Sequence, residues 1–599
     1  MQQHRGMAHS EGWPFPAWQQ GTGKGWHFSV AHDGWAVTQL GLKALTTTEG
    51  WQIVGAKSEG IDPATGLKLA ATDDRITLTT PDVRCDTVMA PFLRIEWSAV
   101  GLSPDSRPSV SWQFQGEEAW QETRRADFPA LSNKQGMQFA NVPLYKQPGY
   151  SGKLARFRIT FDRASGAKLT LKSVITAVDS RHPITNSLFL RGCCEYFMWT
   201  KDIDFLRANL SRMRTSLRFA LAEFSVFKQH HVLVPWVGHD GRSGLVLSPD
   251  GKKTQRHGLG VGNNYWDLLP FGGHDALATI YLFDALNRFI KIEEAVANHA
   301  DWKAGSESQA FDIRQLEELR DSIRNDFQQR FWDAEDGRFV GWIDLEGTAY
   351  EYGFTFVNLE AIHYGLASRE QALSVFDWLD GRREIAGDTS RGADIYHWRF
   401  APRATTKRNI ETYAWMWSGP ETIPWGGQVQ DGGAVLGFSY FDLMSRLKVL
   451  GPDNAWDRLR EILVWFGEVQ SEGGYRAYYA KPGRGTLQGG GTAGGLGLDQ
   501  EFFESVLVPQ TMLYGFLGVE PNAMGISINP SLPKAWPSLC IDGVQSAGYE
   551  LKIEAFADQA IAIEVKKAGS QPLIINTRTQ SLTILPTDIG TTKRLTAKP

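Results

Sequence analysis

The chain has 599 residues, and its 62 Lys and Arg residues against 67 Asp and Glu residues give a net charge of −5. This nearly balanced charge excludes a general nucleic-acid-binding protein, which needs a basic field facing the phosphates. No stretch approaches about 18 consecutive apolar residues, so a membrane-spanning helix is excluded as well. The first ~30 residues lack the apolar core of a signal peptide, so we expect a cytoplasmic protein, or an exported one if the N-terminus was trimmed.

The four cysteines (Cys85, Cys193, Cys194 and Cys540) do not make a disulfide framework. They also lack the paired spacing of a structural zinc site, and no His-Glu-x-x-His or calcium-loop motif is present. A Gly-x-Gly-x-x-Gly motif between a strand and a helix is missing too. The sequence therefore predicts no metal and no cofactor.

Residues 1–182 have the alternating pattern of half-buried strands. Leu93, Ile95 and Trp97 alternate with polar residues, and the apolar residues of 157–161 do the same. Clusters of Pro, Gly, Ser and Asp separate such runs. Period-two alternation between turn residues is typical of an antiparallel β-sandwich, which we predict for this part.

From residue 183 to 525 the apolar residues recur at three- and four-residue spacing, as in amphipathic helices. The clearest stripes predict helices over 203–224, 277–296, 313–331 and 456–466. Further helices are expected at 185–198, 355–366, 368–379, 433–448 and 499–516. Long segments rich in aromatic and glycine residues join these helices at 229–274, 381–432 and 472–498, and connections of such length are usually functional.

Alternation returns in residues 526–599, for example at Leu551 and Ile553, and predicts a small C-terminal β-sheet domain. The chain is thus expected to be multidomain, with an N-terminal sandwich, an all-α centre over 183–525 and a C-terminal sheet. A ring of helix pairs would bury every stripe and gather the long connections at one end.

Aromatic residues are abundant, with 22 Trp, 16 Tyr and 32 Phe, and many Trp residues lie in the long connections. A flat ring with a polar edge suits a ligand that presents both C–H faces and hydroxyls, as a sugar does. The alternative is that these Trp residues only pack in a large hydrophobic core where segments of the chain meet. Residues in loops more often serve function than core packing, which favours the ligand interpretation.

Four short segments resemble motifs of the six-hairpin glycosidases, in the same order along the chain. They are Tyr196-Phe-Met-Trp-Thr-Lys-Asp202, Gly262-Asn-Asn-Tyr-Trp-Asp267, Gln428-Val-Gln-Asp-Gly-Gly433 and Ile528-Asn-Pro-Ser-Leu-Pro-Lys-Ala-Trp536. The last is similar to the entry into the C-terminal sheet of maltose-phosphorylase-like and rhamnosidase-like members. The resemblance implies an (α/α)6 barrel for the central domain, and exo-acting, anomer-inverting cleavage of a glycosidic bond.

Inverting hydrolysis needs a protonated carboxylic acid and an ionised carboxylate, about 6.5–9.5 Å apart, in unlike surroundings. Asp267 is the candidate acid, because it follows Tyr265 and Trp266 and precedes an apolar run, and desolvation raises the pKa of a carboxyl. The alternative for Asp267 is a helix cap or a loop brace. Downstream, we expect Asp275 to cap the following helix and His274 to bind a sugar hydroxyl.

The candidate base is Glu504 or Glu501, which share a helix face after the glycine-rich run Gly489–Gly497. The alternative is that both carboxylates only stabilise the helix, because negative charge near a helix N-terminus interacts favourably with the helix dipole. Glu421, between two Trp and two Pro residues, is a third carboxylate candidate, unless it pairs with a nearby arginine to brace its loop.

The remaining candidates for substrate binding combine stacking rings with hydrogen-bonding groups. They are Tyr265, Trp266, His274, Trp398, Arg399, Arg403, Glu421, Trp425, Gln428 and Asp431. The two arginines either recognise the sugar or pin a long loop. Asp431 stands where the family pattern has Asn, and an ionised Asp accepts hydrogen bonds without donating them.

Two other functions stay open. If phosphate binds at Gly489–Gly497, where the backbone N–H groups before a helix favour an anion, the protein is an inverting phosphorylase that needs no base. A non-catalytic carbohydrate-binding protein is the other. The expected partner is an oligosaccharide or a glycoside in all three cases, while sugar identity, linkage and oligomeric state are not encoded in these patterns.

Overall fold

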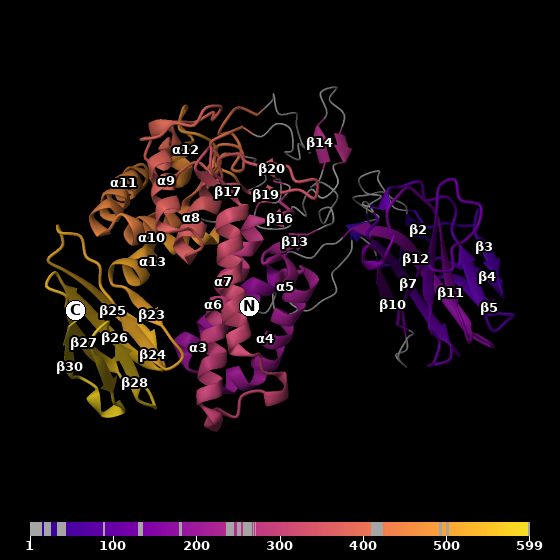
Figure 1. The fold of residues 1–599 in the computed structure, drawn as a ribbon, viewed down its shortest axis with the longest axis horizontal. Coiled ribbons are helices and arrows are strands. Elements are labelled where there is room, and N and C mark those ends of the chain that lie inside the picture. The colour runs from indigo at the N-terminus through magenta and orange to yellow at the C-terminus, as the bar shows by residue number, and fades with distance from the viewer. Residues whose placement is uncertain are drawn as a thin grey trace.

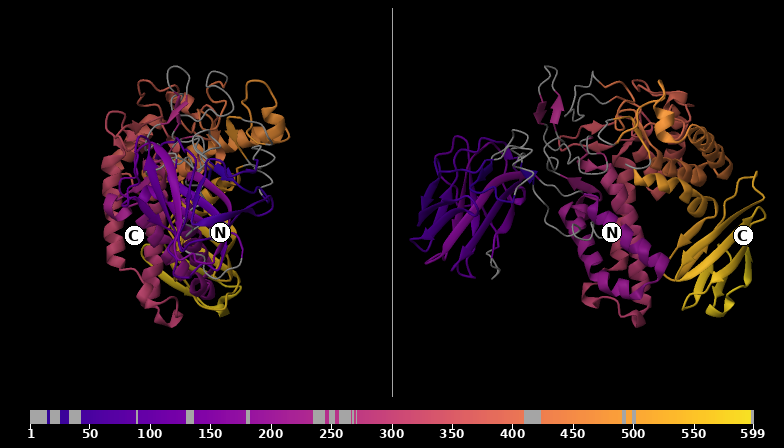
Figure 2. Two further views of the ribbon diagram at one scale, coloured as in Figure 1. Left: turned by 90° about the vertical axis from the view of Figure 1, so that its right-hand side faces the viewer. Right: turned by 180° about the vertical axis from the view of Figure 1, so that it is seen from behind.

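A computed structural model of the chain shows a ring of helices with β-sheets attached on two sides (Figure 1). It describes residues 15–16, 25–32, 43–87, 90–129, 136–178, 183–234, 245–247, 253–255, 266, 269, 271–408, 423–489, 494–498 and 502–596. The N-terminal sheets lie on one side of the helices and the C-terminal sheets on the other, and the view from behind in Figure 2 agrees. No helix in these residues is both long enough and apolar enough to cross a membrane.

Two antiparallel sheets form the N-terminal part and share one hydrophobic core. The first has the order β10(Gln138–Pro143)-β7(Phe92–Val100)-β12(Lys168–Val178)-β5(Gly66–Ala71)-β4(Ala56–Asp62), with β1(Phe15–Pro16) and β2(Gly25–His27) also paired to β12. The second has the order β3(Gln52–Val54)-β6(Ile76–Thr79)-β11(Leu154–Phe161)-β8(Ser109–Phe114)-β9(Arg125–Asp127). The residues expected to point inward do so, because Ile95, Trp97, Phe157 and Ile159 are all buried.

A short segment of the N-terminal part, residues 145–146, contacts the ring. Lys146 lies 2.6 Å from a carboxylate oxygen of Glu223, and the Tyr145 hydroxyl donates to the other oxygen. Glu223 ends α4(Ile203–Glu223), so this carboxylate ties the sheets to the outside of the ring.

The helices form hairpins, each with an inner and an outer member. The inner members are α3(Thr185–Thr200), α6(Ala276–Asn298), α8(Thr355–Tyr364) and α10(Ser439–Val449), and the outer members are α4, α7(Ile313–Arg330), α9(Arg369–Leu379) and α11(Pro452–Ser471). The short α5(Val226–Gln229) and α12(Tyr475–Tyr479) lie in connections. The inner helices bury residues around much of their circumference, whereas α4, α7 and α11 bury one stripe.

The closing segment, residues 503–516, comprises a 3-10 turn, α13(Leu507–Gln510) and a π-helical turn. Consecutive inner helices pack on one another, and the closing segment packs on α10. The indole of Trp199 on α3 donates to the Tyr514 hydroxyl at 3.2 Å, which completes the ring. The described residues therefore contain four hairpins and a closing segment, and the (α/α)6 barrel remains a prediction.

Neighbouring inner helices run in the same direction. Arg191 and Glu195 of α3 pair with Asp284 and Arg288 of α6 in matching order. Each outer helix therefore returns to the N-terminal end of the next inner helix, which we call the loop end of the ring. The described parts of the long connections that were expected to be functional gather there, towards the top of Figure 1.

Small sheets order parts of these connections. One has the order β13(Val232–Val234)-β16(Gly273–Asp275)-β19(Trp342–Ile343)-β20(Ala349–Tyr350). The others are β14(Leu245–Leu247) with β15(Lys253–Gln255), β17(Trp332–Asp333) with β18(Arg338–Phe339), and the parallel pair β21(Ala434–Val435) and β22(Leu496–Gly497). As predicted, Asp275 caps α6, accepting from the backbone of Ala278 at 2.9 Å.

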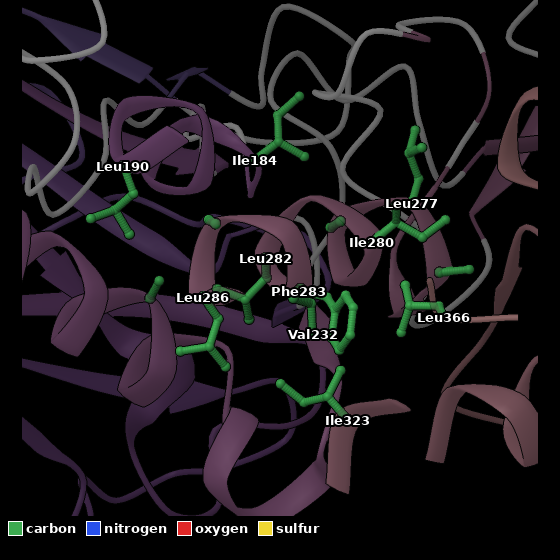
Figure 3. Packing of buried hydrophobic residues seen from close by; sticks show 14 of the residues in the cluster. Ile184, Leu190, Val232, Leu277, Ile280, Leu282, Phe283, Leu286, Ile323 and Leu366 are labelled. Atoms are coloured by element: carbon green, nitrogen blue, oxygen red, sulfur yellow. The ribbon is translucent and has the colours of Figure 1, made fainter. Parts of the chain in front are cut away.

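The main core lies between α3, α4, α6, α7 and α8. Figure 3 shows part of it, with Leu282, Phe283 and Leu286 of α6 near Leu190 of α3 and Ile323 of α7. All five side chains are fully buried. The three-four spacing in the sequence thus corresponds to contacts between the helices.

Two four-stranded sheets form the C-terminal part and share a core that includes Leu551, Ile553 and Ile563. Their orders are β23(Val519–Pro521)-β24(Gly525–Ile528)-β28(Leu573–Asn576)-β29(Ser581–Ile584) and β25(Ser538–Ser546)-β26(Tyr549–Phe556)-β27(Ala560–Lys567)-β30(Thr592–Thr596). The backbone of Ala547 donates to the carbonyl of Trp199 at 2.9 Å, which attaches these sheets to the end of α3.

Candidate functional site

An arginine held near two tryptophans lies at the loop end. The Arg403 guanidinium is 5.4 Å from the Trp398 ring and 5.7 Å from the Trp425 ring, and the residue is 4% exposed. It donates to the Gly432 carbonyl at 2.5 Å and to the Asp394 carbonyl at 3.0 Å. The half-buried rings therefore lie beside an arginine whose own contacts hold two parts of the 381–432 connection together.

Glycine allows the backbone of this connection to approach that of a second long connection, 472–498, closely. The chain at 428–435 bonds to the glycine-rich segment through Val429 to Gly494 at 3.1 Å and Ala434 to Gly495 at 2.9 Å. A Cβ atom at Gly495 would lie 1.8 Å from the carbonyl oxygen of Gly426. This close approach requires glycine, whatever ligand the loop binds.

Replacing Gly495 by Ala is therefore expected to force the two connections apart and to lower the free energy of unfolding by about 1–3 kcal/mol. Thermal unfolding and proteolysis of the loops measure this effect. Gly467→Ala on the exposed face of α11 is the matched control, because nothing lies within 4 Å of its Cβ and the helix gains roughly 0.5–1 kcal/mol. Equal stabilities of the two variants would contradict the close approach.

Several predicted site residues lie outside the described residues, namely Tyr265, Asp267, Glu421 and Glu501. Trp266 is described and is 1% exposed. Its ring stacks on Phe356 at 4.2 Å and on Phe438 at 5.3 Å, at the starts of α8 and α10. This core position differs from the one expected for a ring that stacks on a sugar, so Trp398 and Trp425 remain the described rings for which stacking is predicted.

Arg399 is held in an ion pair. Its guanidinium lies 2.7 and 3.0 Å from the two carboxylate oxygens of Glu468 on α11. Of the two roles considered for Arg399 and Arg403, pinning a loop is the one that their contacts in this structure fulfil.

His274 lies in a chain of titratable groups between β16 and α7. Its Nδ1 atom is 2.6 Å from the Nε2 atom of His231, whose Nδ1 atom is 2.8 Å from Asp326. Burial and the neighbouring His231 lower the pKa of His274 to about 4. The imidazole is therefore neutral near pH 7, and one of its nitrogens is already engaged within the protein.

Gln428 and Asp431 form a tight turn and are both buried. The Gln428 side chain accepts from the backbone of Gln430 at 2.5 Å. A carboxylate oxygen of Asp431 lies 3.3 Å from the Arg408 guanidinium. Asp431, which stands where the family pattern has Asn, thus lies beside the cationic side chain of Arg408 in this structure.

Glu504 is half-buried and lies at the start of the closing segment, at the loop end. Its Cγ atom would be 2.5 Å from a Cβ atom on Gly437, just before α10. The segment 428–438 therefore touches the Trp398, Arg403 and Trp425 cluster at Gly432 and touches Glu504 at Gly437.

A buried ion cluster that the sequence analysis missed lies beside this segment. Arg338 is fully buried and binds both carboxylate oxygens of Asp388 at 2.6 and 2.8 Å, and one oxygen of Glu351 at 2.5 Å. Asp388 also accepts from Thr406 at 2.7 Å. Burial raises the pKa of Glu351 to about 7, against the opposing effect of Arg338. The signal in the sequence is Tyr350-Glu351-Tyr352, a carboxyl between aromatic residues just before an inner helix.

A second buried carboxyl, Glu360 on α8, has a pKa that burial raises to about 8 from an ordinary 4.5. The folded chain keeps this proton up to about pH 8, whereas an unfolded chain releases it near pH 4.5. Stability from this group is therefore greatest at acidic pH and is lost as the pH rises through 8.

We expect Glu360→Gln to remove this loss, raising the free energy of unfolding by about 4–5 kcal/mol at pH 9 relative to the wild type, with little change at pH 5. Urea unfolding across this pH range measures it. Parallel pH profiles for the two proteins would contradict a protonated Glu360.

No group of three His, Cys, Asp or Glu side chains in the described part of the chain could hold a metal ion. The described loop end instead supplies carboxyls, indole rings and guanidinium groups. Such a set can protonate a leaving oxygen, deprotonate a water and stack on a sugar.

No protein-family model matches the chain, and no curated protein matches it. Among solved structures, a rhamnosidase of glycoside hydrolase family 78 from a Bacillus species matches 84% of this chain at 11% identity with a TM-score of 0.35. The match covers 53% of that rhamnosidase, so the chain spans about half its length.

Two further structures are similar at this level. A putative kojibiose phosphorylase from the human microbiome matches 69% of this chain and 50% of its own at 12% identity and a TM-score of 0.31. A family 63 mannosylglycerate hydrolase from Thermus thermophilus matches 50% of this chain and 69% of its own at 11% identity and a TM-score of 0.30.

Proposed function

We propose that the protein is a glycoside hydrolase, exo-acting and anomer-inverting, that binds its substrate at the loop end of the ring. The observation that carries the proposal is the arrangement around the segment 428–438, which joins the Trp398, Arg403 and Trp425 cluster to Glu504. Two indole rings and a carboxylate thus lie at the same end of the ring of helices. They supply the stacking surfaces and the base that the proposed reaction needs.

Asp267 is the proposed general acid, and Glu504 or Glu501 is the proposed base that activates water. In the sequence Asp267 precedes α6, and Glu504 lies in the first turn of the closing segment. The proposal requires both carboxyls to face one pocket at the loop end. Trp398 and Trp425 are proposed to stack on the sugar ring. Gln428, Asp431 and His274 are the proposed partners of its hydroxyls, together with Tyr265 and Glu421.

A phosphorylase is the competing proposal. It needs backbone N–H groups of the glycine-rich loop to be free for phosphate. In the described part of that loop, the N–H groups of Gly495 and Leu496 donate to the Thr486 carbonyl at 3.0 and 3.1 Å. This use of the donors within the protein favours hydrolysis by water.

The test is incubation of the pure protein with α- and β-linked disaccharides and oligosaccharides, with and without phosphate. Release of free sugar without phosphate supports the hydrolase. Release of sugar 1-phosphate in the presence of phosphate alone would replace it by the phosphorylase. Binding of sugars without any turnover would replace both by a carbohydrate-binding protein.

A further inference from the structure

A cavity of about 830 Å³ lies inside the ring, away from the loop end. Its wall comes from all four inner helices and the closing segment, and β23 of the C-terminal sheets covers its far side. Its lining residues include Met198, Lys291 and Tyr364, which lie towards the C-terminal ends of α3, α6 and α8. A cavity of roughly 300–1,000 Å³ is the usual size for a small-molecule site.

An aromatic layer lies between this cavity and the loop end. Trp266 stacks on Phe356 and Phe438 where α8 and α10 begin. The Phe438 ring is 6.0 Å from that of Phe441, which lines the cavity. A ligand in the cavity would therefore be separate from a substrate at the loop end.

The charges of the cavity wall balance within the wall. Asp284 lies 2.7 Å from Arg191 and 3.0 Å from Arg288. Arg288 also pairs with Glu195, and Lys291 lies 2.9 Å from Glu520. Three cations thus face three carboxylates, which selects against a strongly charged ligand.

Uncharged polar groups in the wall are, in contrast, free to bind. Within the part of the chain that the structure describes, the side chains of Asn287, Gln510, Tyr440 and His363 line the cavity without a hydrogen-bond partner. Burial lowers the pKa of His363 to about 3, so its ring is neutral. Each of these groups can both donate and accept a hydrogen bond.

Aromatic rings stand beside these polar groups. The rings of Tyr364 and Tyr440 lie 4.6 and 5.5 Å from that of His363, and Phe441 and Tyr514 also line the cavity. Apolar ring faces next to groups that both donate and accept are complementary to the C–H faces and hydroxyls of a sugar.

We propose that this cavity is a second saccharide site, which binds a neutral mono- or disaccharide independently of the loop end. The amides of Asn287 and Gln510 and the hydroxyl of Tyr440 bind the sugar hydroxyls, and the tyrosine rings cover its apolar face. This site requires no catalytic carboxylate, so it stands whether or not the loop end is an active site.

The test is calorimetric titration with glucose, rhamnose, maltose and cellobiose. The wild type is expected to bind at least one of them. Asn287→Leu/Gln510→Leu should weaken that binding tenfold or more, because each substitution removes a hydrogen-bonding amide. Gln470→Leu, at an exposed position of α11, is the matched control, and this variant should bind the sugar as the wild type does. If the double variant does not fold, Tyr440→Phe removes one hydroxyl and keeps the ring.

A Trp398→Ala variant separates the two sites, since it alters the loop end and leaves the cavity intact. Unchanged cavity binding in this variant supports the proposal. Binding that is lost in Trp398→Ala and kept in the cavity variants would overturn it, as would no binding of the four sugars by the wild type. This test measures binding, whereas the turnover assay measures hydrolysis. Absence of hydrolysis would therefore contradict the proposed function without contradicting the cavity site.

Discussion

Asp267→Asn is expected to lower kcat/KM for the best glycoside substrate by about 10²–10⁴-fold, the range of a lost general acid. The amide keeps the size of the carboxyl and cannot donate a proton to the leaving oxygen. The melting temperature and the KM should change little. Stopped assays of sugar release, with thermal unfolding alongside, measure the three quantities.

A substrate with a good leaving group sharpens this test. Its leaving oxygen needs little protonation, so Asp267→Asn should lose less activity on an activated aryl glycoside than on a disaccharide. Equal losses on both substrates would assign Asp267 to binding or to structure. Retained activity on the disaccharide would remove Asp267 from the mechanism, and Glu351→Gln would then test the buried carboxyl whose pKa is about 7.

The base is resolved by the pair Glu504→Gln and Glu501→Gln. The variant that loses the base should lose activity on activated and ordinary substrates alike, because water is no longer deprotonated. Full activity in both variants would leave the loop end without its proposed base and would favour attack by phosphate.

The second large effect is on stability. Arg338→Met is expected to lower the free energy of unfolding by about 3–5 kcal/mol, because it leaves Asp388 and Glu351 buried without their shared cation. Arg338 is fully buried, and the side chains of Asp388 and Glu351 are 1% and 10% exposed. Denaturant unfolding near neutral pH measures the loss.

Arg382→Met is the matched control for this prediction. Arg382 also bridges two carboxylates, Asp377 at 2.7 Å and Asp380 at 3.0 Å, but its side chain is 54% exposed. A pair open to water contributes roughly 0–1 kcal/mol, so this variant should unfold nearly as the wild type does. A comparable loss in both variants would contradict the importance of burial.

The contrast between the two arginines shows where sequence reasoning reaches its limit. Both stand near acidic residues in the sequence, and neither pattern tells which one is buried. Arg338 meets Asp388 and Thr406 across 50 and 68 residues of chain, after several elements have packed. Its cluster was therefore missed, although Glu351 between two tyrosines was a visible signal.

The sequence by itself determined the elements and their order. Alternation marked buried strand residues such as Trp97 and Ile553, and three-four spacing marked the stripes of α4, α6, α7 and α11. Both patterns are visible in the sequence because a strand turns every second side chain to one face, and a helix every third or fourth. The cap at Asp275 was predicted for the same reason, since it forms within one helical turn.

Only the tertiary structure decided which side chains meet. Trp266 was expected at a sugar and lies in the core on Phe356 and Phe438, at the starts of α8 and α10. Arg399 was placed by Glu468, a residue of α11. The cavity with Asn287, Tyr440 and Gln510 arises from three separate segments of the chain. Burial, pairing and pKa depend on such distant contacts, whereas periodicity depends on neighbours along the chain.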